Sequence, residues 1–438
     1  MKIEKLPKDD NACAWYETLP PPRPATRQTG DRRFDYVVLG AGFTGLAAAR
    51  QLAWHLPETE IALVEAQRVG YGASGRNSGF IIDLPHSVST AEHAGGLEEG
   101  RRELRLNRFA IAHLRDIVHT HGIACDWSER GKIHAAVEDK GIADLNRFKR
   151  SLDALGEPYT ELDAKGLSDI VGTRYYRAGI HTPGTVLIQP AALARGLGDT
   201  LPENVRLFEE SPVIGVDYGG PIELVCPEGR IAAKTLLLAN NGFAAEFGFL
   251  RGRLIPVMTF GSLTRPLKPD EQAALGGEPD WGLIPADHLG TTLRRTRDHR
   301  ILIRNTFTYA PDFACAKAER ERIWAHHEAA FKARFAMLPE VGFEHSWGGV
   351  LCLSRNAAPC FGKLAPGVWA AVCHNGVGVA KGTYSGKLLA DLVVGADSEP
   401  LRDMRSFPRP AWNIPQPFLG LALRMYINRQ QRRAGRER

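Results

Sequence analysis

The fold of this chain of 438 residues is decided by the stretch Asp35-Tyr36-Val37-Val38-Leu39-Gly40-Ala41-Gly42-Phe43-Thr44-Gly45. It begins as a short apolar run rich in β-branched residues, which favours a strand, and continues into the glycine spacing GxGxxG. A helix-forming segment follows at residues 46–52, and a second apolar run at residues 61–64 ends on Glu65. This order of strand, tight turn, helix, strand and acid is typical of a parallel α/β unit that binds a dinucleotide.

The residues of the turn suit the phosphates of such a ligand. Gly40 lets the chain turn tightly out of the strand, Gly42 lets a pyrophosphate approach the backbone, and Gly45 lets the helix pack closely on the sheet. Phe43 and Thr44 lie within the turn, and the N-terminus of the following helix presents free N–H groups and the positive end of its dipole to the phosphates. We therefore expect all five residues to contribute to a cofactor site.

The segment after the second strand carries more of the predicted site. Glu65 lies twenty residues after Gly45, where an acid accepts hydrogen bonds from a ribose. Residues 68–79, RVGYGASGRNSG, form a second loop of small residues and arginines. An NAD site does not usually have such a loop after its acid, whereas this many small residues can lie against a large flat ligand. The further cofactor-binding residues predicted here are Ala66, Arg68, Gly72, Ala73, Ser74, Arg76, Asn77 and Ser78.

These two loops resemble those of the FAD family that oxidises amines and amino acids, which includes D-amino-acid oxidase, glycine oxidase and sarcosine oxidase. The sequence GASGRNSG at residues 72–79 is most similar to the γ-glutamylputrescine oxidase-like branch. The resemblance covers roughly residues 15–395 and implies FAD as the cofactor. It also implies the fold class, which is α/β: a Rossmann-like FAD-binding domain with an antiparallel-sheet (α+β) substrate domain.

Two later segments take their expected roles from the resemblance. In the family, the backbone near Val213 contacts adenine, and the turn that corresponds to Ala239 and Asn240 lies beside the cofactor. The glycine-rich loop at residues 373–382 runs along the flavin ring, and the dipole of the helix after it points at the N1–O2 edge. The residues predicted to bind the cofactor in this loop are Gly376, Val377, Gly378 and Val379, although Val377 replaces a histidine of the relatives.

Three residues are candidates for catalysis. His374 is the best ionisable candidate near the ring, and Lys381 could pair with flavin O2 or with a substrate carboxylate. Arg294 lies where relatives often have an arginine on a pocket-facing strand. For each of the three, a structural or solvent-facing role remains an open alternative.

The resemblance implies a reaction in which the C–N bond of an amine or amino acid is oxidised to an imine. Hydride passes to flavin N5, and the imine is then hydrolysed by water. The electron acceptor would be O2 or a quinone, and the sequence does not separate an oxidase from a dehydrogenase. The alternative reading is a non-catalytic or RNA-directed flavoprotein whose basic tail binds an acidic partner.

The chain is longer than one hydrophobic core usually serves, so we expect two domains. An extended arm at residues 1–30 precedes them, with Trp15 and Tyr16 as candidate anchors. The division into domains is predicted from the order of the segments. The FAD-binding domain takes residues 31–85, 165–245 and 345–400, the substrate domain takes 86–164 and 246–344, and a C-terminal apolar helix and basic tail take 401–438.

The composition is that of an ordinary globular chain, with 44% apolar and 24% charged residues. The seven cysteines are scattered, without a CxxC pair, which argues for a reducing compartment and against a disulfide framework or a metal site. No apolar run has membrane-spanning length and the N-terminus does not resemble a signal peptide, so we expect a cytoplasmic location. The net charge of +5 lies in the tail, and the body gives no sign of nucleic-acid binding.

The C-terminal tail has two interpretations. It holds nine arginines against two acids between residues 401 and 438. An amphipathic helix there could rest on an anionic membrane, which would suit a dehydrogenase that reduces quinone. The helix could instead pack on the body, which we favour because related soluble sequences commonly end in a similar helix. The residues predicted to pack are Phe418, Leu421, Met425 and Tyr426.

Overall fold

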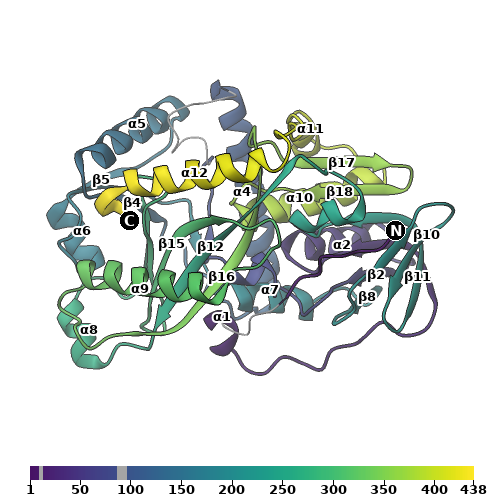
Figure 1. Cartoon of the computed structure of the whole chain (residues 1–438), viewed down its shortest axis with the longest axis horizontal. Coiled ribbons are helices and arrows are strands. Elements are labelled where there is room, and N and C mark those ends of the chain that lie inside the picture. Colours follow the sequence, from purple (N-terminus) through teal and green to yellow (C-terminus); the bar gives the residue numbers. More distant parts are fainter. Residues whose placement is uncertain (9–12, 86–95) are drawn as a thin grey trace.

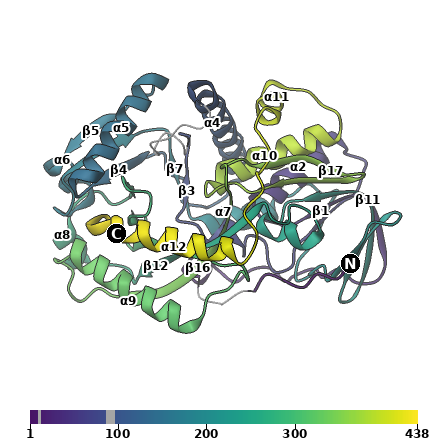
Figure 2. The ribbon, with the colours of Figure 1, turned by 45° about the horizontal axis from the view of Figure 1, so that its top comes forward.

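The computed structural model describes residues 1–8, 13–85 and 96–438, and two large β-sheets organise it (Figure 1). The first sheet and its helices lie on the right in Figure 1, and the second sheet lies on the left. Figure 2 shows the same division after a rotation. A small antiparallel pair, β3 (Phe80–Ile81) with β7 (Val186–Leu187), lies outside both sheets. The predicted α/β fold class is confirmed.

The first sheet has the parallel core that the opening stretch predicts. Its parallel strands follow the order β18-β11-β1-β2-β8, and β17 and β10 run antiparallel to their neighbours. All four residues of β2 are buried, because both faces of the sheet are covered. The strands are β1 (Arg32–Leu39), β2 (Ile61–Val64), β8 (Val205–Phe208), β9 (Gly215–Asp217), β10 (Ile222–Cys226), β11 (Gly229–Leu238), β17 (Cys360–Ala365) and β18 (Val368–Val372).

Helices cover one face of this sheet and approach each other very closely. The glycine turn leads directly into α2, which is rich in alanine and packs against α10. A Cβ atom added at Gly386 of α10 would lie 2.0 Å from the carbonyl oxygen of Thr44 in α2, so only glycine fits there. The helices of this layer are α2 (Phe43–His55), α4 (Gly96–His121), α7 (Pro190–Asp199) and α10 (Gly378–Val393).

The second sheet is mostly antiparallel and has the order β16-β12-β15-β14-β13-β4-β6-β5, with β13 and β4 parallel. Its apolar core is shared with the helices that pack on it. The strands are β4 (Lys132–Ala136), β5 (Thr160–Asp163), β6 (Ala178–Thr182), β12 (Leu254–Thr264), β13 (Trp281–Pro285), β14 (Thr292–Arg295), β15 (Ile301–Tyr309) and β16 (Phe343–Ser354). The helices are α5 (Asp139–Leu155), α6 (Ala164–Val171), α8 (Pro269–Leu275) and α9 (Lys317–Arg334).

The chain crosses between the sheets at different residues from those of the predicted domain ranges. Strands β6 and β16 pair within the second sheet, although most of their residues fall in ranges predicted for the FAD-binding domain. Helix α4 shares the core of the first sheet, although its range was predicted for the substrate domain. Strand pairing is non-local, so segment order alone does not locate these crossings, and the exact domain ranges stay a prediction.

The N-terminal arm contacts the body at two places. Lys2 forms an isolated bridge with Gly215 of β9, and Ile3 is buried. Farther on, α1 (Ala14–Glu17) buries Trp15, whose Nε1 donates a hydrogen bond to the carbonyl of Asn77 at 2.8 Å. The predicted anchor at Trp15 is therefore present, and parts of the arm lie inside the fold.

The C-terminal segment contains α11 (Glu399–Arg405) and α12 (Phe418–Arg433), which crosses the outer surface of the second sheet (Figure 1). Helix α12 docks on the body, but the predicted packing face is wrong. The side that it buries holds Gly420, Ile427 and Gln431, whereas the side predicted to pack is exposed. The exposed fractions are 67% for Phe418, 61% for Leu421, 64% for Met425 and 54% for Tyr426.

No helix within the described residues has both the length and the apolar character needed to cross a bilayer.

Candidate functional site

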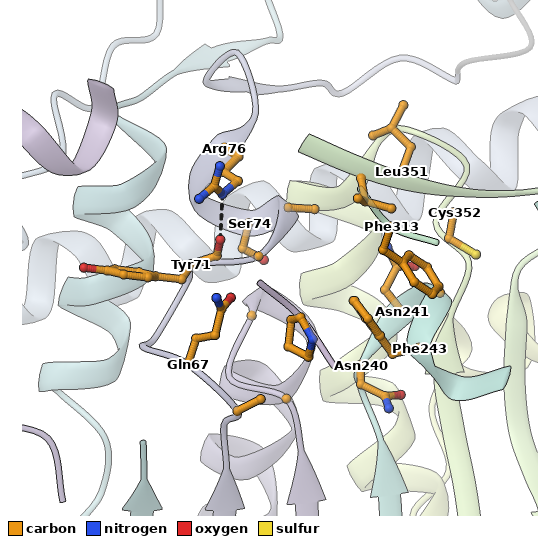
Figure 3. A pocket seen from close by; sticks show the side chains of 18 of the residues that line it. Gln67, Tyr71, Ser74, Arg76, Asn240, Asn241, Phe243, Phe313, Leu351 and Cys352 are labelled. Atoms are coloured by element: carbon orange, nitrogen blue, oxygen red, sulfur yellow. Dashed lines mark hydrogen bonds between the residues drawn. The ribbon is translucent and has the colours of Figure 1, made fainter. Parts of the chain in front are cut away.

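A cavity of about 340 Å³ lies at the carboxyl ends of β1, β2 and β11 and extends to β12 and β16 of the second sheet (Figure 3). Ligands of open α/β sheets bind at this edge. Most residues predicted to bind the cofactor line this cavity. They are Gly40, Gly42, Phe43, Thr44, Glu65, Ala66, Gly72, Ala73, Ser74, Arg76, Asn77, Val213, Ala239, Asn240, Gly376, Gly378 and Val379.

The glycine turn has the geometry that its residues predict. Gly40 has a φ of 103°, in the region that favours glycine, and a Cβ atom there would lie 3.0 Å from the carbonyl oxygen of Ala239. Helix α2 begins at Phe43, and its N-cap, Gly42, has no side chain to cap the first N–H groups. The N–H of Phe43 donates to Ser74 Oγ at 3.0 Å. The helix N-terminus thus borders the cavity with backbone donors and a positive dipole, which suits a pyrophosphate.

Glu65 lies at the end of β2, and its carboxylate accepts two backbone hydrogen bonds. Oε2 accepts from the N–H of Ala41 at 2.7 Å, and Oε1 accepts from the N–H of Gln67 at 2.9 Å. Burial raises the pKa of Glu65, while these backbone donors oppose the rise. The hydrogen bonds fix the carboxylate at the cavity wall, where it is placed to accept hydrogen bonds from ribose hydroxyls.

The second loop connects the two sheets. Arg76 Nε donates to the carbonyl of Tyr71 at 2.8 Å, and its Nη1 donates to the carbonyl of Gly348 in β16 at 3.2 Å (Figure 3). In return, Trp347 Nε1 donates to the carbonyl of Arg76 at 3.0 Å. Asn77 Nδ2 closes the loop on itself by donating to the carbonyl of Ser74 at 2.6 Å. The small residues of this loop therefore form one wall of the cavity.

The third loop, before α10, contains left-handed backbone at Cys373, Asn375 and Gly376, with φ of 68°, 51° and 88°. Asn375 stabilises it: Nδ2 donates to the carbonyls of Ala357 and Cys373, and Oδ1 accepts from the N–H of Ser354. This bend brings His374 to the cavity.

His374 is held by one hydrogen bond and is neutral at pH 7. Its Nε2 lies 2.9 Å from Thr44 Oγ1, and among the described residues its Nδ1 has no hydrogen-bond partner. Burial, and next the charge of Lys381, lower the pKa of His374 to about 4. A neutral imidazole with an unused nitrogen at the cavity wall can exchange a hydrogen bond with a ligand, but does not supply a positive charge.

The other two catalytic candidates do not line the cavity. Lys381 Nζ forms an ion pair with Glu103 of α4 at 2.8 Å. Arg294 is almost fully buried; its Nη1 donates to the carbonyls of Gly79 and Ile188, and its guanidinium lies over the ring of Trp15. Burial lowers the pKa of Arg294 to about 10. In this structure Arg294 connects β14 to the second loop, and Lys381 connects α10 to α4.

Four of the residues predicted to bind the cofactor are also absent from the cavity wall: Gly45, Arg68, Ser78 and Val377. Gly45 serves close packing, since a Cβ there would lie 1.7 Å from the carbonyl oxygen of Gly40. Arg68 forms an ion pair with Glu209 at 3.2 Å.

Sequence reasoning missed two parts of the wall. One part is the start of the arm, which contributes Ile3, Lys5 and Lys8. Its sequence has no periodicity that would have indicated this position. The other is an apolar wall in which Phe243 and Phe313 stack with ring centroids 4.1 Å apart. Strand periodicity could have indicated its β12 and β16 members, but not the partner that they face. The remaining residues of the apolar wall are Met258, Phe260, Val350 and Leu351.

The wall also suits a dinucleotide that offers hydrogen-bond donors. Two buried polar atoms of lining residues, Asn240 Oδ1 and His374 Nδ1, lack a partner among the described residues. Buried polar groups are rarely left unpaired, so a bound ligand is expected to complete them. Together with the donors of α2 and the acceptor Glu65, the chain provides partners for a pyrophosphate, a ribose and a further polar group.

The depressed pKa of His374 predicts a loss of stability in acid. The unfolded chain takes up a proton near pH 6.5, whereas the folded chain resists protonation until about pH 4. This group therefore contributes its full stability above pH 6.5 and loses it as the pH falls to 4, by at most on the order of 3 kcal/mol. We expect His374→Asn to flatten the pH dependence of the urea midpoint across this window. His119→Asn, at an exposed position, is the control, and identical slopes for both variants would contradict the prediction.

Comparison with known proteins identifies the family of this chain. The model of the family "DAO: FAD dependent oxidoreductase" matches residues 35–392. "Probable oxidoreductase OrdL" of Rhizobium meliloti (strain 1021) is 26% identical over 433 residues, covering 95% of this chain and 97% of that protein. Gamma-glutamylputrescine oxidoreductase of Escherichia coli (strain K12) is 26% identical over 411 residues, covering 91% and 93%.

A similar fold is found among solved structures. Glycine oxidase from Geobacillus kaustophilus superimposes with a TM-score of 0.70 at 19% identity, over 88% of this chain and all of that one. The family match includes the glycine turn, the acid after β2 and the loop before α10, which the structure brings to one cavity. The chain therefore belongs to the DAO family and is an FAD-dependent oxidoreductase.

Proposed function

We propose that this enzyme oxidises the C–N bond of an amine or amino acid to an imine, which water then hydrolyses. The observation that carries the proposal is the continuity of one cavity from the glycine turn of α2 to the apolar wall of the second sheet. The proposal is also supported by the relatives, which include gamma-glutamylputrescine oxidoreductase and sarcosine oxidase subunit beta. FAD, when bound, supplies the acceptor for the substrate's hydride.

The residues that line the cavity would hold the cofactor. The N-terminus of α2 would bind the pyrophosphate, and Glu65 would bind a ribose. His374 would offer Nδ1 to a polar group of the cofactor or substrate. Because its pKa is lowered to about 4, His374 would act there without a charge. The N-terminus of α10 begins next to this loop at Gly378 and would favour negative charge nearby.

The apolar wall is proposed as the substrate side. Burial beside Phe243, Phe313 and Met258 disfavours a charged ammonium group and so lowers the pKa of a bound amine. The neutral amine has a lone pair that assists hydride loss from the neighbouring carbon. Arg320 of α9 lines the same cavity and would bind a carboxylate on the substrate. An amine that also bears a carboxylate would meet both surfaces.

The acceptor of the electrons is proposed to be O2 or a quinone. A cytoplasmic location is also proposed: all seven cysteines lie in the described part of the chain and none of them is in a disulfide, in keeping with a reducing compartment.

An anaerobic reduction screen tests the proposed reaction. We expect the yellow oxidised enzyme to bleach when mixed, without oxygen, with a member of a set of polyamines, their γ-glutamyl derivatives, N-methyl amino acids and D-amino acids. The measurement is the flavin absorbance after each addition, with dithionite as the positive control for reducible flavin. Bleaching by 2-hydroxy acids but by no amine would overturn the proposal, and a non-catalytic flavoprotein would stay yellow with every substrate class.

A further inference from the structure

An exposed apolar patch covers the outer side of α12 and the segment that leads into it. The residues of this C-terminal patch are Trp412, Ile414, Phe418, Leu421, Met425 and Tyr426. These are six of the eleven exposed large apolar side chains in the described part of the chain, so they form a concentration rather than the scatter that is normal on a surface. Those on the helix follow a spacing of three, four and one residues, which places them on one face.

The helix is held firmly with this face outward. Gln431 exchanges hydrogen bonds with the backbone of Phe307 in β15, through Oε1 at 3.2 Å and Nε2 at 3.3 Å. Beyond the helix, Glu437 Oε1 accepts from the N–H of Val137 at 2.7 Å, and Arg334 Nη2 donates to the carbonyl of Glu437 at 3.0 Å. The patch is therefore presented by an anchored element, and binding through it would not require the helix to fold first.

The segment that carries the patch has charged residues of one sign. No Asp or Glu occurs from residue 404 to residue 436, and seven arginines do. The guanidinium of Arg253, from the neighbouring loop, lies 4.3 Å from the ring centre of Trp412. The exposed arginines of this segment are Arg405, Arg409, Arg424, Arg429, Arg432, Arg433 and Arg436.

We propose that the C-terminal patch docks the enzyme on the surface of an anionic lipid bilayer. The apolar side chains would enter the boundary between head groups and acyl chains, with Trp412 and Tyr426 as amphipathic aromatic residues at that level. The arginines would meet the lipid phosphates. A second copy of this chain fits less well, because a symmetric contact would bring the two sets of arginines together. The proposal does not depend on which substrate the enzyme oxidises.

Flotation with vesicles tests the docking. The full-length, FAD-loaded enzyme is mixed with vesicles of phosphatidylglycerol and phosphatidylcholine in equal amounts, or of phosphatidylcholine alone, and centrifuged through a density gradient. We expect the enzyme to float with the anionic vesicles and to remain at the bottom with the neutral ones. High salt should reduce flotation because it screens the arginines. Failure to float with anionic vesicles at low salt would overturn the proposal.

Matched variants test whether vesicle binding requires the C-terminal patch rather than exposed apolar residues in general. The pair Leu421→Glu with Met425→Glu, and separately Arg429→Glu with Arg433→Glu, should each lower the vesicle partition coefficient by about tenfold or more. Trp54→Glu, which replaces an exposed apolar residue on α2, should leave it unchanged. Flavin content and dithionite reduction verify that each variant is folded. Equal loss in the Trp54 variant would overturn the proposal.

The competing occupants give distinct results. A contact between two copies of the chain predicts three results. The wild-type enzyme would be a dimer by light scattering, Leu421→Glu with Met425→Glu would make it monomeric, and neither protein would float. These results together would overturn the lipid proposal. Wild-type enzyme that is monomeric by light scattering and stays off both kinds of vesicle would also overturn the lipid proposal, and would leave an acidic protein partner as the occupant to test. Because flotation is scored without substrate, these outcomes are independent of the proposed oxidation.

Discussion

A Gly42→Val protein is expected to fold and to purify without yellow colour. The backbone of Gly42 has a φ of −83°, which other residues adopt, so the fold itself tolerates a side chain. The obstacle is the space at the N-terminus of α2, where a Cβ would lie 2.6 Å from Ser74 Oγ and valine adds two further methyl groups beside the cavity. Losing two charge-assisted hydrogen bonds to the pyrophosphate, at about 1.5–3 kcal/mol each, weakens FAD binding at least about a hundredfold.

The measurement is the ratio of flavin to protein absorbance after purification, with circular dichroism as the test of folding. Gly42→Ala should retain part of the flavin, because Ser74 can rotate away from a single methyl group. Gly100→Ala is the matched control: this buried glycine lies in α4, and a Cβ there would make an ordinary contact of 3.6 Å with Leu155. A Gly42→Val protein that stayed as yellow as the control would show that the phosphates lie elsewhere.

The alanine variant of Gly386 should lose stability without touching the cavity. Its new Cβ would lie 2.0 Å from the carbonyl oxygen of Thr44 and 2.8 Å from its carbon, so relief requires the backbones of α2 and α10 to separate. Forcing an extra methyl group into a close-packed contact costs about 1–3 kcal/mol or more. We expect the apparent melting temperature to fall by about 1–3 °C, with flavin release at a lower temperature, because Thr44 lines the cavity.

Gly382 supplies the comparison for this effect, one turn earlier on the same helix. A Cβ at Gly382 would lie 2.9 Å from Thr44 Oγ1, which is the end of a side chain and can turn. Gly382→Ala should therefore lower the melting temperature less than Gly386→Ala, as measured by flavin fluorescence during heating. Equal shifts for the two variants would show that the helices separate easily and that their close contact is not what stabilises this layer.

Local sequence signals predicted the first half of the site well, for a physical reason. The glycines of the turn, the buried strand and the acid after it each act through backbone geometry near their own position. Gly40 and Gly42 therefore reach the same cavity as Glu65 without any information about distant partners. Composition also indicates the loop at residues 68–79, since small residues let a ligand approach.

Side chains whose role depends on a distant partner were not predictable in this way. Arg294 lies on the expected strand, but its guanidinium binds the carbonyl of Gly79 because the second loop passes there. The apolar stripe of α12 resembles a packing face, yet the side that docks holds Gly420 and Gln431, which match the backbone and aromatic groups of β15. In each case the deciding contact is made by residues far away in sequence.

The bridge between Lys2 and Gly215 has a consequence for the order of events during biosynthesis. Ile3 donates its N–H to the carbonyl of Ile214, so this part of the arm meets its partner only after more than two hundred further residues have been made. At about 5–20 residues per second, the ribosome needs on the order of ten to forty seconds to synthesise them. The glycine turn leaves the ribosome long before that moment. Ile3, which lines the cavity, therefore reaches its place only after the glycine turn and the whole chain up to Ile214 have been made.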